Sequence, residues 1–229
     1  MKETEPIISV IMSTYNDEKK VGKSIESILN QTYKNFEFLI VDDFSQDSTL
    51  DVLKHYEAKD RRVKIFTNKQ NIGLTKSLNK LIFHSKGEYI ARQDSDDFSE
   101  KNRFKKQINF LIDNEYDACG TRAKAIQSSK KIPGKSFYLP MKLHVKIKNP
   151  LIHGTLLINK EVLNKLGNYD ESFYYAQDYK LLNDLIDSGF KIANLNNCLY
   201  NLNMEDNIST IYSDKQKYFA DCVRKNINP

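Results

Sequence analysis

The strongest constraint on the fold is an alternation of apolar runs with amphipathic segments through the first half of the chain. Short apolar runs predict buried strands at residues 7–12, 36–41 and 63–66 and inside 87–97. Between these runs, apolar residues at helical spacing predict helices near residues 21–29, 48–58 and 73–84. Because alternating strands and helices favour parallel pairing with right-handed crossovers, we expect an α/β fold with a mostly parallel sheet.

The second half of the chain is expected to be less regular. Apolar periodicity predicts helices at residues 100–114 and around 181–186, and strands at 118–126 and 156–158. The lysine-rich segment 127–148 shows no clear period and is expected to be a mobile loop region with one short helix. A last helix is expected at 213–226, with its inward face formed by Tyr218, Phe219 and Cys222.

Composition limits the classes of protein to consider. A chain of 229 residues with 40% hydrophobic content can form one substantial domain. The net charge of +5 comes from scattered lysines, which favours an anionic partner and argues against a nucleic-acid surface. Three separated cysteines indicate a reducing compartment. Because the sequence shows no signal peptide and no apolar run of about 20 residues, we expect a cytoplasmic protein.

Three carboxylates follow the predicted strand inside residues 87–97. Asp94, Asp96 and Asp97 would repel one another, and a divalent cation would relieve that repulsion. Oxygen ligands suit Mg²⁺ or Mn²⁺, and Mg²⁺ binds through one or two carboxylates together with substrate phosphates. A solvated acidic turn, with Asp97 or Ser99 capping the next helix, is an equally good interpretation of this short pattern.

Two common nucleotide-binding motifs do not occur in the sequence. Neither a G-x-G-x-x-G fingerprint nor a G-x-x-x-x-G-K-[ST] loop is found, which disfavours dinucleotide binding of the Rossmann type and P-loop chemistry. Any phosphate ligand must therefore be held in another way.

Several motifs in order resemble family 2 glycosyltransferases of the GT-A fold, which are inverting nucleotide-sugar transferases. The matching stretches are, in chain order, PIISVIMSTYN, VDDFSQDST, NIGLTKSLN, GEYIARQDSDD and YAQDYKLLNDL. The resemblance runs from Pro6 to about Ser209 and implies a single GT-A domain. In that domain, residues 1–97 would bind the nucleotide sugar, and residues 98–229 would bind the acceptor and supply the catalytic base.

The resemblance also implies roles for particular residues. Asp43 would accept a hydrogen bond from the base, since a carboxylate suits the N–H of uracil. Mn²⁺ or Mg²⁺ would be held by Asp96 with help from Asp94. The remaining implied contacts to the nucleotide sugar are Thr14, Tyr15, Asn16, Asn71, Gly73, Asn79, Arg92, Asp94 and Ser95. From the residues alone, other interpretations remain open. Gly73 could simply form a turn, Asn79 could be an amide on a helix surface, and Arg92 could be a salt-bridge partner of the carboxylates.

The implied catalytic base is Asp178, and His153, Thr155 and Gln177 would lie near the donor or acceptor sugar. Helical periodicity puts Asp178 in the first turn of a helix, where the helix dipole favours the ionised carboxylate. Taken alone, an Asp in that position is typical of a helix cap, and a lone His is typically held by a structural hydrogen bond. The family pattern favours the base for Asp178.

One segment departs from the family. Residues 199–209 read LYNLNMEDNIS and lack the basic residue and the histidine usual there, which puts contacts to the diphosphate and metal in doubt. No Q-x-x-R-W motif of processive synthases is found, so transfer of a single sugar is implied. The resemblance implies a UDP-hexose or UDP-N-acetylhexosamine donor and a glycan or lipid-linked acceptor in bacterial surface polysaccharide synthesis.

The lysines between Lys130 and Lys148 could attract the protein to the inner face of the cell membrane as a peripheral contact, although a solvated loop is also an ordinary interpretation. Two other functional classes remain open. One is a metal-dependent nucleotidyltransferase, which would be expected to carry a Gly-rich basic loop where this chain has STYND. The other is a non-catalytic sugar-binding module.

Overall fold

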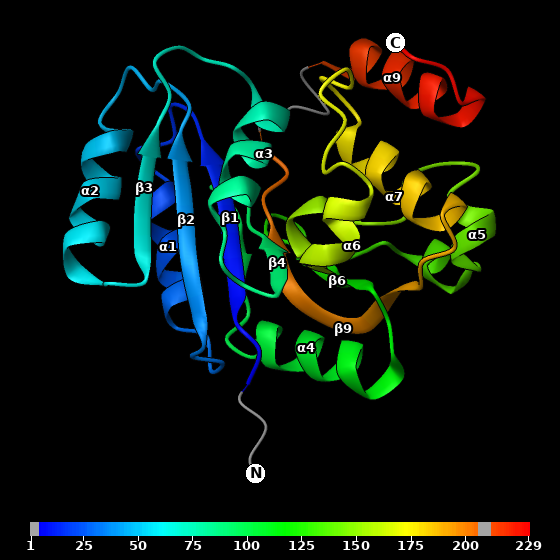
Figure 1. The fold of residues 1–229 in the computed structure, drawn as a ribbon, viewed down its shortest axis with the longest axis horizontal. Helices are drawn as coiled ribbons and strands as arrows, with labels where there is room; N and C mark the ends of the chain where they lie inside the picture. The colour runs from blue at the N-terminus through cyan, green and yellow to red at the C-terminus, as the bar shows by residue number, and fades with distance from the viewer. Residues whose placement is uncertain (1–4, 206–211) are drawn as a thin grey trace.

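A computed structural model describes residues 5–205 and 212–229, and within them one curled sheet runs through the molecule (Figure 1). The strand order is β3-β2-β1-β4-β8-β6-β9-β5, with β7 paired to β6 outside this path. Helices cover both faces of the sheet. The expected α/β fold with a mostly parallel sheet in its first half is confirmed.

The first half of the sheet contains the four predicted strands, which pair in parallel: β1 (Ile8–Thr14), β2 (Phe36–Asp42), β3 (Val63–Thr67) and β4 (Tyr89–Arg92). They are connected by the three predicted helices: α1 (Val21–Leu29), α2 (Thr49–Lys59) and α3 (Leu74–His84). Strands β1 and β2 are buried on both faces, which explains their continuous apolar sequences.

The second half of the sheet is mixed. Strand β8 (Leu157–Asn159) pairs antiparallel with β4, which ends the run of parallel pairing. The other strands are β5 (Phe98–Ser99), β6 (Ala118–Ala125), β7 (Lys131–Ile132) and β9 (Ile192–Leu202). The helices are α4 (Arg103–Asn114), α5 (Met141–His144), α6 (Lys160–Lys165), α7 (Gln177–Asp187) and α9 (Ser213–Lys225), with short 3-10 turns η1 (Lys135–Tyr138) and η2 (His153–Thr155).

Two apolar clusters form the core, one on each face of the sheet. Side chains of α1, α2 and α4 pack on one face, against alternate residues of β1 such as Val10 and Met12. Side chains of α3, α6, α7 and α9 pack on the other face, against Ile11. The alternation follows from the period of two along a strand. Because β1, β2 and β4 run parallel, their carboxyl ends lie at one edge of the sheet.

Three sequence predictions need correction. The helix expected at 100–114 begins at Arg103, because the backbone N–H of Glu100 still bonds to the Leu199 carbonyl of β9 and Asn102 occupies the N-cap. The segment 127–148 contains β7, η1 and α5 rather than a loop with one short helix. Tyr218 is exposed and not inward-facing, because the buried side of α9 runs through Cys222 and Val223 with Phe219 packed beside them.

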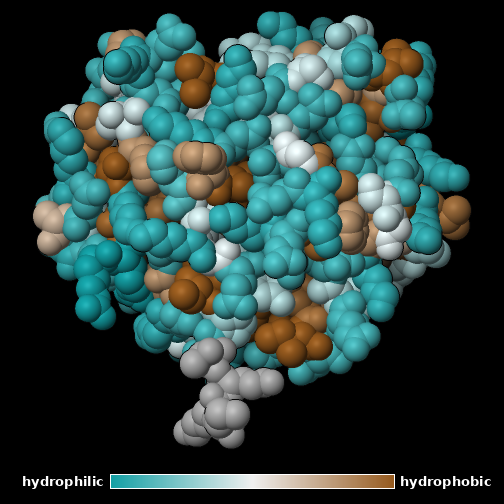
Figure 2. Space-filling view, viewed as in Figure 1, coloured by the Kyte–Doolittle hydropathy of each residue, from teal (hydrophilic) through white to brown (hydrophobic). Residues whose placement is uncertain are grey.

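The surface seen in Figure 2 is mainly hydrophilic, with separate apolar patches. Among the helices of the described residues, none combines the length and apolar character needed to cross a membrane.

Candidate active site

An acidic cluster of Asp94, Asp96 and Asp97 lies where the chain leaves β4. Two residues hold this cluster in place: Tyr200 within β9 and Asn203 just after it. The Asp97 carboxylate is buried and accepts a hydrogen bond from the backbone N–H of Asn203 at 2.6 Å. The Asn203 amide nitrogen donates to Oδ2 of Asp96 at 3.0 Å. The capping interpretation is wrong, because α4 starts after Asn102 and Asp97 instead binds the backbone at the end of β9.

Negative charge in this cluster is only partly balanced. Burial, then repulsion from Asp94 and Asp96, raises the pKa of Asp97 to about 8. Burial followed by repulsion from Asp94 also raises the pKa of Asp96. Asp17, in the loop after β1, has a pKa raised first by burial, with Asp96 as a further contributor. An additional positive charge at this edge would therefore stabilise the ionised carboxylates.

The donor atoms suit a metal that is shared with a ligand. In residues 5–205 and 212–229, no three His, Cys, Asp or Glu side chains converge so as to hold a metal ion by themselves. Asp94 and Asp96, which are separated by one residue in the chain, are both partly exposed and offer carboxylate oxygens. One or two carboxylates completed by substrate phosphates is the usual arrangement for Mg²⁺, so these residues fit Mg²⁺ or Mn²⁺.

Tyr200, which the sequence did not single out, supports the cluster from β9. Its hydroxyl accepts a hydrogen bond from the backbone N–H of Asp94 at 3.1 Å and also lies against Asp97. The fully buried Arg103 guanidinium lies 5.1 Å from the Tyr200 ring centre. A Cβ on Gly154 would come within 2.2 Å of the Tyr200 hydroxyl and 2.6 Å of Oδ2 of Asp94, so only glycine fits there.

The loop after β1 reaches the loop after β2. Asn16 adopts a positive φ of 50° and donates its backbone N–H to Oγ of Ser45 at 2.9 Å, and its side-chain oxygen accepts from the N–H of Gln46 at 2.8 Å. Thr14 is buried, and its hydroxyl has no hydrogen-bond partner among the described residues, whereas Tyr15 is exposed. The hydroxyl of Thr14 is thus a buried polar group without a partner at the carboxyl end of β1.

Asp43 holds the loop that precedes α3. Its Oδ1 accepts from Nδ2 of Asn68 at 2.8 Å and from the N–H of Ile72 at 2.9 Å, and its Oδ2 accepts from the N–H of Gly73 at 2.9 Å. A carboxylate has about four lone-pair sites, so one remains for a ligand. Asn71 lies exposed in this loop.

Gly73 is required by its backbone conformation and by a neighbour. Its φ is +85°, and a Cβ would come within 2.7 Å of the Tyr174 ring. Tyr174 precedes α7, so the glycine loop of the first half lies against the segment that leads to Asp178.

Asp178 lies in the first turn of α7, as predicted. Its Oδ2 accepts from Nδ2 of Asn149 at 2.7 Å. Burial raises its pKa to about 6; backbone N–H groups at the helix start oppose the rise, and the charge of Asp94 adds to it. A carboxylate with a pKa near 6 is ionised at pH 7 and still basic enough to take a proton.

His153 and Tyr169 lie close to the same edge. Nε2 of His153 and the Tyr169 hydroxyl are 2.8 Å apart. Burial, reinforced by Arg92, lowers the pKa of His153 well below its ordinary value, so this imidazole is neutral at pH 7. The structural hydrogen bond anticipated for a lone His is present.

Three of the expected ligand contacts are buried, and two of them bind other groups of the protein. Thr155 is fully buried; its hydroxyl donates to the Ile152 carbonyl and accepts from the Thr121 N–H, which corrects its assignment to a sugar. Arg92 is buried and pairs with Asp94, the salt bridge that the sequence left open. Gln177 is also largely buried, at the start of α7.

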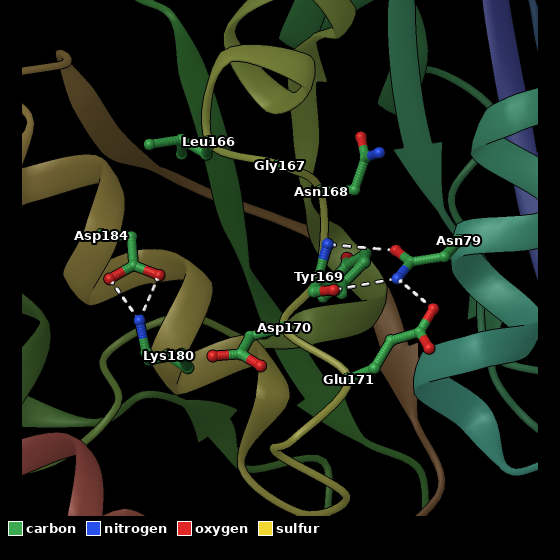
Figure 3. A pocket seen from close by; sticks show the side chains of 9 residues that line it. All are labelled: Asn79, Leu166, Gly167, Asn168, Tyr169, Asp170, Glu171, Lys180 and Asp184. Carbon is green, nitrogen blue, oxygen red and sulfur yellow. Dashed lines mark hydrogen bonds and ion pairs between the residues drawn. The ribbon is translucent and has the colours of Figure 1, made fainter. Parts of the chain in front are cut away.

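Asn79 binds the segment before α7 instead of pointing to the acidic cluster. Figure 3 shows its amide bonded to both the N–H and the carbonyl of Tyr169, at 3.0 and 2.9 Å, and to Glu171. The pocket in this view has a volume of about 420 Å³ and is lined by polar residues such as Asp170 and Asp184. It does not include the acidic cluster, so Asn79 positions the 169–171 segment.

The fold is that of the GT-A glycosyltransferases. TarS of S. aureus, solved in complex with UDP, superposes with a TM-score of 0.75 at 21% identity, covering 93% of this chain and 64% of TarS. The mannosyltransferase PcManGT of Pyrobaculum calidifontis, solved with GDP-Man and Mn²⁺, gives a TM-score of 0.77 at 17% identity, covering 99% of this chain and 67% of PcManGT. At these identities the likeness concerns the fold.

The chain belongs to glycosyl transferase family 2, whose model matches residues 9–178. A relative involved in polysaccharide synthesis is the O-antigen biosynthesis glycosyltransferase WbnJ of Escherichia coli. It is 35% identical over 202 residues, covering 85% of this chain and 78% of WbnJ. The resemblance read from the sequence motifs is thereby confirmed.

Proposed function

We propose that this protein is an inverting glycosyltransferase that moves one sugar from a nucleotide diphosphate sugar to a hydroxyl group. The donor is UDP-hexose or UDP-N-acetylhexosamine, and the acceptor is a glycan or a lipid-linked glycan in bacterial surface polysaccharide synthesis. Residues 1–97 bind the donor, and residues 98–229 bind the acceptor and carry the base. The protein acts in the cytoplasm, at the inner face of the cell membrane.

The single observation that carries this proposal is the relation of Asp178 to the acidic cluster. Asp178 is partly exposed, has a pKa of about 6, and senses the charge of Asp94. One carboxylate with a pKa near neutral pH is thus within electrostatic range of a group of carboxylates suited to a metal and a diphosphate. Separate base and metal-binding roles for such carboxylates are what sugar transfer with inversion requires.

On the donor side, the ends of β1 and β2 receive the nucleoside. The remaining lone pair of Asp43 accepts from the base N–H, and Thr14, with its unpartnered buried hydroxyl, ends the neighbouring strand β1. The loops that flank this nucleoside site are shaped by Tyr15 and Asn16 after β1 and by Asn71 and Gly73 before α3. TarS is solved with UDP, which supports a uridine nucleotide here as well.

On the acceptor side, the Asp178 carboxylate takes the proton of the acceptor hydroxyl as that oxygen forms a bond to the anomeric carbon. The bond from that carbon to the diphosphate breaks on the opposite face, and the diphosphate leaves with the electron pair. Asn149 fixes the Asp178 side chain through its 2.7 Å hydrogen bond. A single displacement inverts the anomeric centre.

Asp96, with Asp94, would hold Mn²⁺ or Mg²⁺ against the diphosphate. When bound, such an ion neutralises charge on the leaving group as a Lewis acid. PcManGT is solved with Mn²⁺, which supports this choice. Tyr200 and Asn203, both within the unusual 199–209 segment, position the carboxylates. Residues 206–209 of that segment lie outside the described part of the chain.

The proposal is tested by titrating UDP with and without Mn²⁺ and then screening nucleotide sugars, GDP-mannose included, for hydrolysis and transfer. Metal-dependent UDP binding with turnover of a UDP-sugar is the expected result. Metal-dependent binding without turnover of any sugar nucleotide would favour a sugar-binding module. Pyrophosphate release from a nucleoside triphosphate and a sugar phosphate would favour a nucleotidyltransferase.

A further inference from the structure

A row of apolar side chains is exposed on the segment between η1 and η2. Leu139, Leu143 and Ile147 are 48%, 59% and 65% exposed. Helical backbone hydrogen bonds continue beyond α5, with Val145 N–H to the Met141 carbonyl at 3.0 Å and Lys148 N–H to the His144 carbonyl at 3.1 Å. Leu143 and Ile147 are four residues apart in these turns and therefore share one face. Leu139 precedes them in extended backbone just before Pro140, and we call these three exposed apolar side chains the stripe.

The inner face of the same turns already packs on the protein. His144 and Val145 are buried, and Met141 packs against the core. The exposed stripe is therefore not needed to hold the segment in place. Contiguous exposed apolar residues cost solubility and usually mark a contact surface.

Along the chain, the charged residues beside the stripe are all of one sign. Lys142, Lys146 and Lys148 are exposed beside it. Residues 118–160 contain no Asp or Glu at all, although they include nine lysines and arginines, at positions 122, 124, 130, 131, 135, 142, 146, 148 and 160. A second copy of this surface would repel the first, whereas an anionic surface would be attracted.

The stripe is joined closely to the proposed base. The Tyr179 hydroxyl of α7 donates to the Val145 carbonyl, and Arg224 of α9 donates to the Ile147 carbonyl at 3.4 Å. Asn149, immediately after these turns, donates to Asp178. In Figure 1, α5 and α7 lie on the side of the molecule away from α2 and β3. Whatever binds the stripe is thus next to the acceptor side.

We propose that residues 138–148 form a docking surface for an anionic lipid bilayer. Leu139, Leu143 and Ile147 enter the boundary between headgroups and acyl chains, and the lysines meet lipid phosphates. Apolar side chains on one face with lysines around them are the combination that interfacial helices use. The inference rests on the proposed function in one respect: a lipid-linked acceptor held in that bilayer would present its hydroxyl to Asp178.

The apolar stripe gives this surface a property that lysines alone would not provide. Attraction between lysines and headgroups is screened beyond about 8 Å at physiological ionic strength. Burial of leucine and isoleucine in the bilayer is not screened. Binding should therefore weaken with salt but persist, once formed, on anionic vesicles.

The chain contains no tryptophan, so a single introduced one reports its own surroundings. Leu143→Trp is compared with Ile112→Trp, placed on the exposed side of α4. With vesicles of phosphatidylglycerol, we expect a blue shift and quenching by brominated acyl chains for Leu143→Trp alone, and neither effect with phosphatidylcholine vesicles. Equal quenching at both positions, or no quenching at position 143, would overturn the proposal.

A second experiment measures the affinity for the same vesicles. Leu143→Ser with Ile147→Ser should lower it at least tenfold, while the matched pair Phe83→Ser with Ile112→Ser should leave it unchanged. Hydrolysis of a soluble nucleotide sugar should be the same in both double variants. Unchanged vesicle affinity in the stripe variant, or a dimer of the wild type that the stripe variant abolishes, refutes the bilayer surface. Failure of all variants and of the wild type to turn over any donor refutes the proposed function instead.

Discussion

Replacing Asp178 with Asn removes the proposed base while keeping the shape of the side chain. An Asn oxygen can still accept the 2.7 Å hydrogen bond from Asn149, so the first turn of α7 should keep its structure. Transfer should fall by at least about 10², the usual loss when a general base is removed. Donor affinity should stay close to the wild-type value, because the proposed role of Asp178 is toward the acceptor.

The same variant has a calculable effect on stability. Each pKa unit corresponds to about 1.4 kcal/mol. The rise from 3.8 to about 6 therefore makes ionised Asp178 about 3 kcal/mol less favourable in the folded protein than in the unfolded chain. Since the folded-state pKa is the higher one, the proton-linked stability is fully present below pH 3.8 and is lost as the pH rises through 6.

Asp178→Asn does not titrate and should escape this loss. Its free energy of unfolding relative to wild type should increase by up to about 3 kcal/mol between pH 4 and pH 7.5. Urea unfolding at the two pH values measures the change. Asp187→Asn, an exposed position on the same helix, is the control and should show no such increase.

The kinetic assay is the pH dependence of kcat/KM, which reports the free enzyme. The wild type should lose activity below a pKa of about 6, because the protonated carboxyl cannot accept a proton. The variant should show no such acid limb in its residual activity. Transfer above one tenth of the wild-type rate, with the acid limb retained, would show that another residue is the base.

The remaining predictions concern the acidic cluster. Asp96→Ala should abolish Mn²⁺-dependent UDP binding in calorimetry without unfolding the protein. The control Asp113→Ala, on the exposed side of α4, should bind normally. Unchanged binding by Asp96→Ala would exclude Asp96 as a metal ligand. Asn203→Ala removes a 3.0 Å hydrogen bond to Asp96 and should weaken Mn²⁺ affinity by about 10- to 100-fold, as second-layer partners of a metal do; an unchanged affinity would leave Asn203 a purely structural residue. Gly154→Ala should eliminate transfer, because its Cβ would meet the Tyr200 hydroxyl at 2.2 Å. The control Gly134→Ala, which has no described atom within 4 Å of its Cβ, should be harmless. Equal activity of the two variants would refute the close packing.

The local sequence pattern was sufficient to predict most strands of the parallel half of the sheet and the edge where a ligand would bind. The apolar runs predicted β1 to β4 because a strand buried on both faces leaves little room for polar residues. The polar residues that follow β1, β2 and β4 could be predicted to meet, since parallel strands end at one edge. The class of enzyme followed from several motifs in order.

Individual contacts depended on segments far apart in the chain. The sequence alone did not show that Asn203 would reach Asp96, because nothing local specifies that β9 pairs with β5, the short strand that follows the acidic cluster. Tyr200 and Gly154 were missed for the same reason. Conversely, Thr155 and Arg92 have chemistry suited to a ligand, and only burial shows that their hydrogen bonds are made inside the protein.

The sequence by itself determined the periodicity, and with it the α/β order, the position of Asp178 in the first turn of α7, and the concentration of carboxylates after β4. The tertiary structure alone decided the pKa of Asp178, through burial, and which side of residues 138–148 is exposed. Periodicity is a property of neighbours in the chain, whereas burial and charge interactions depend on distances between residues that folding brings together.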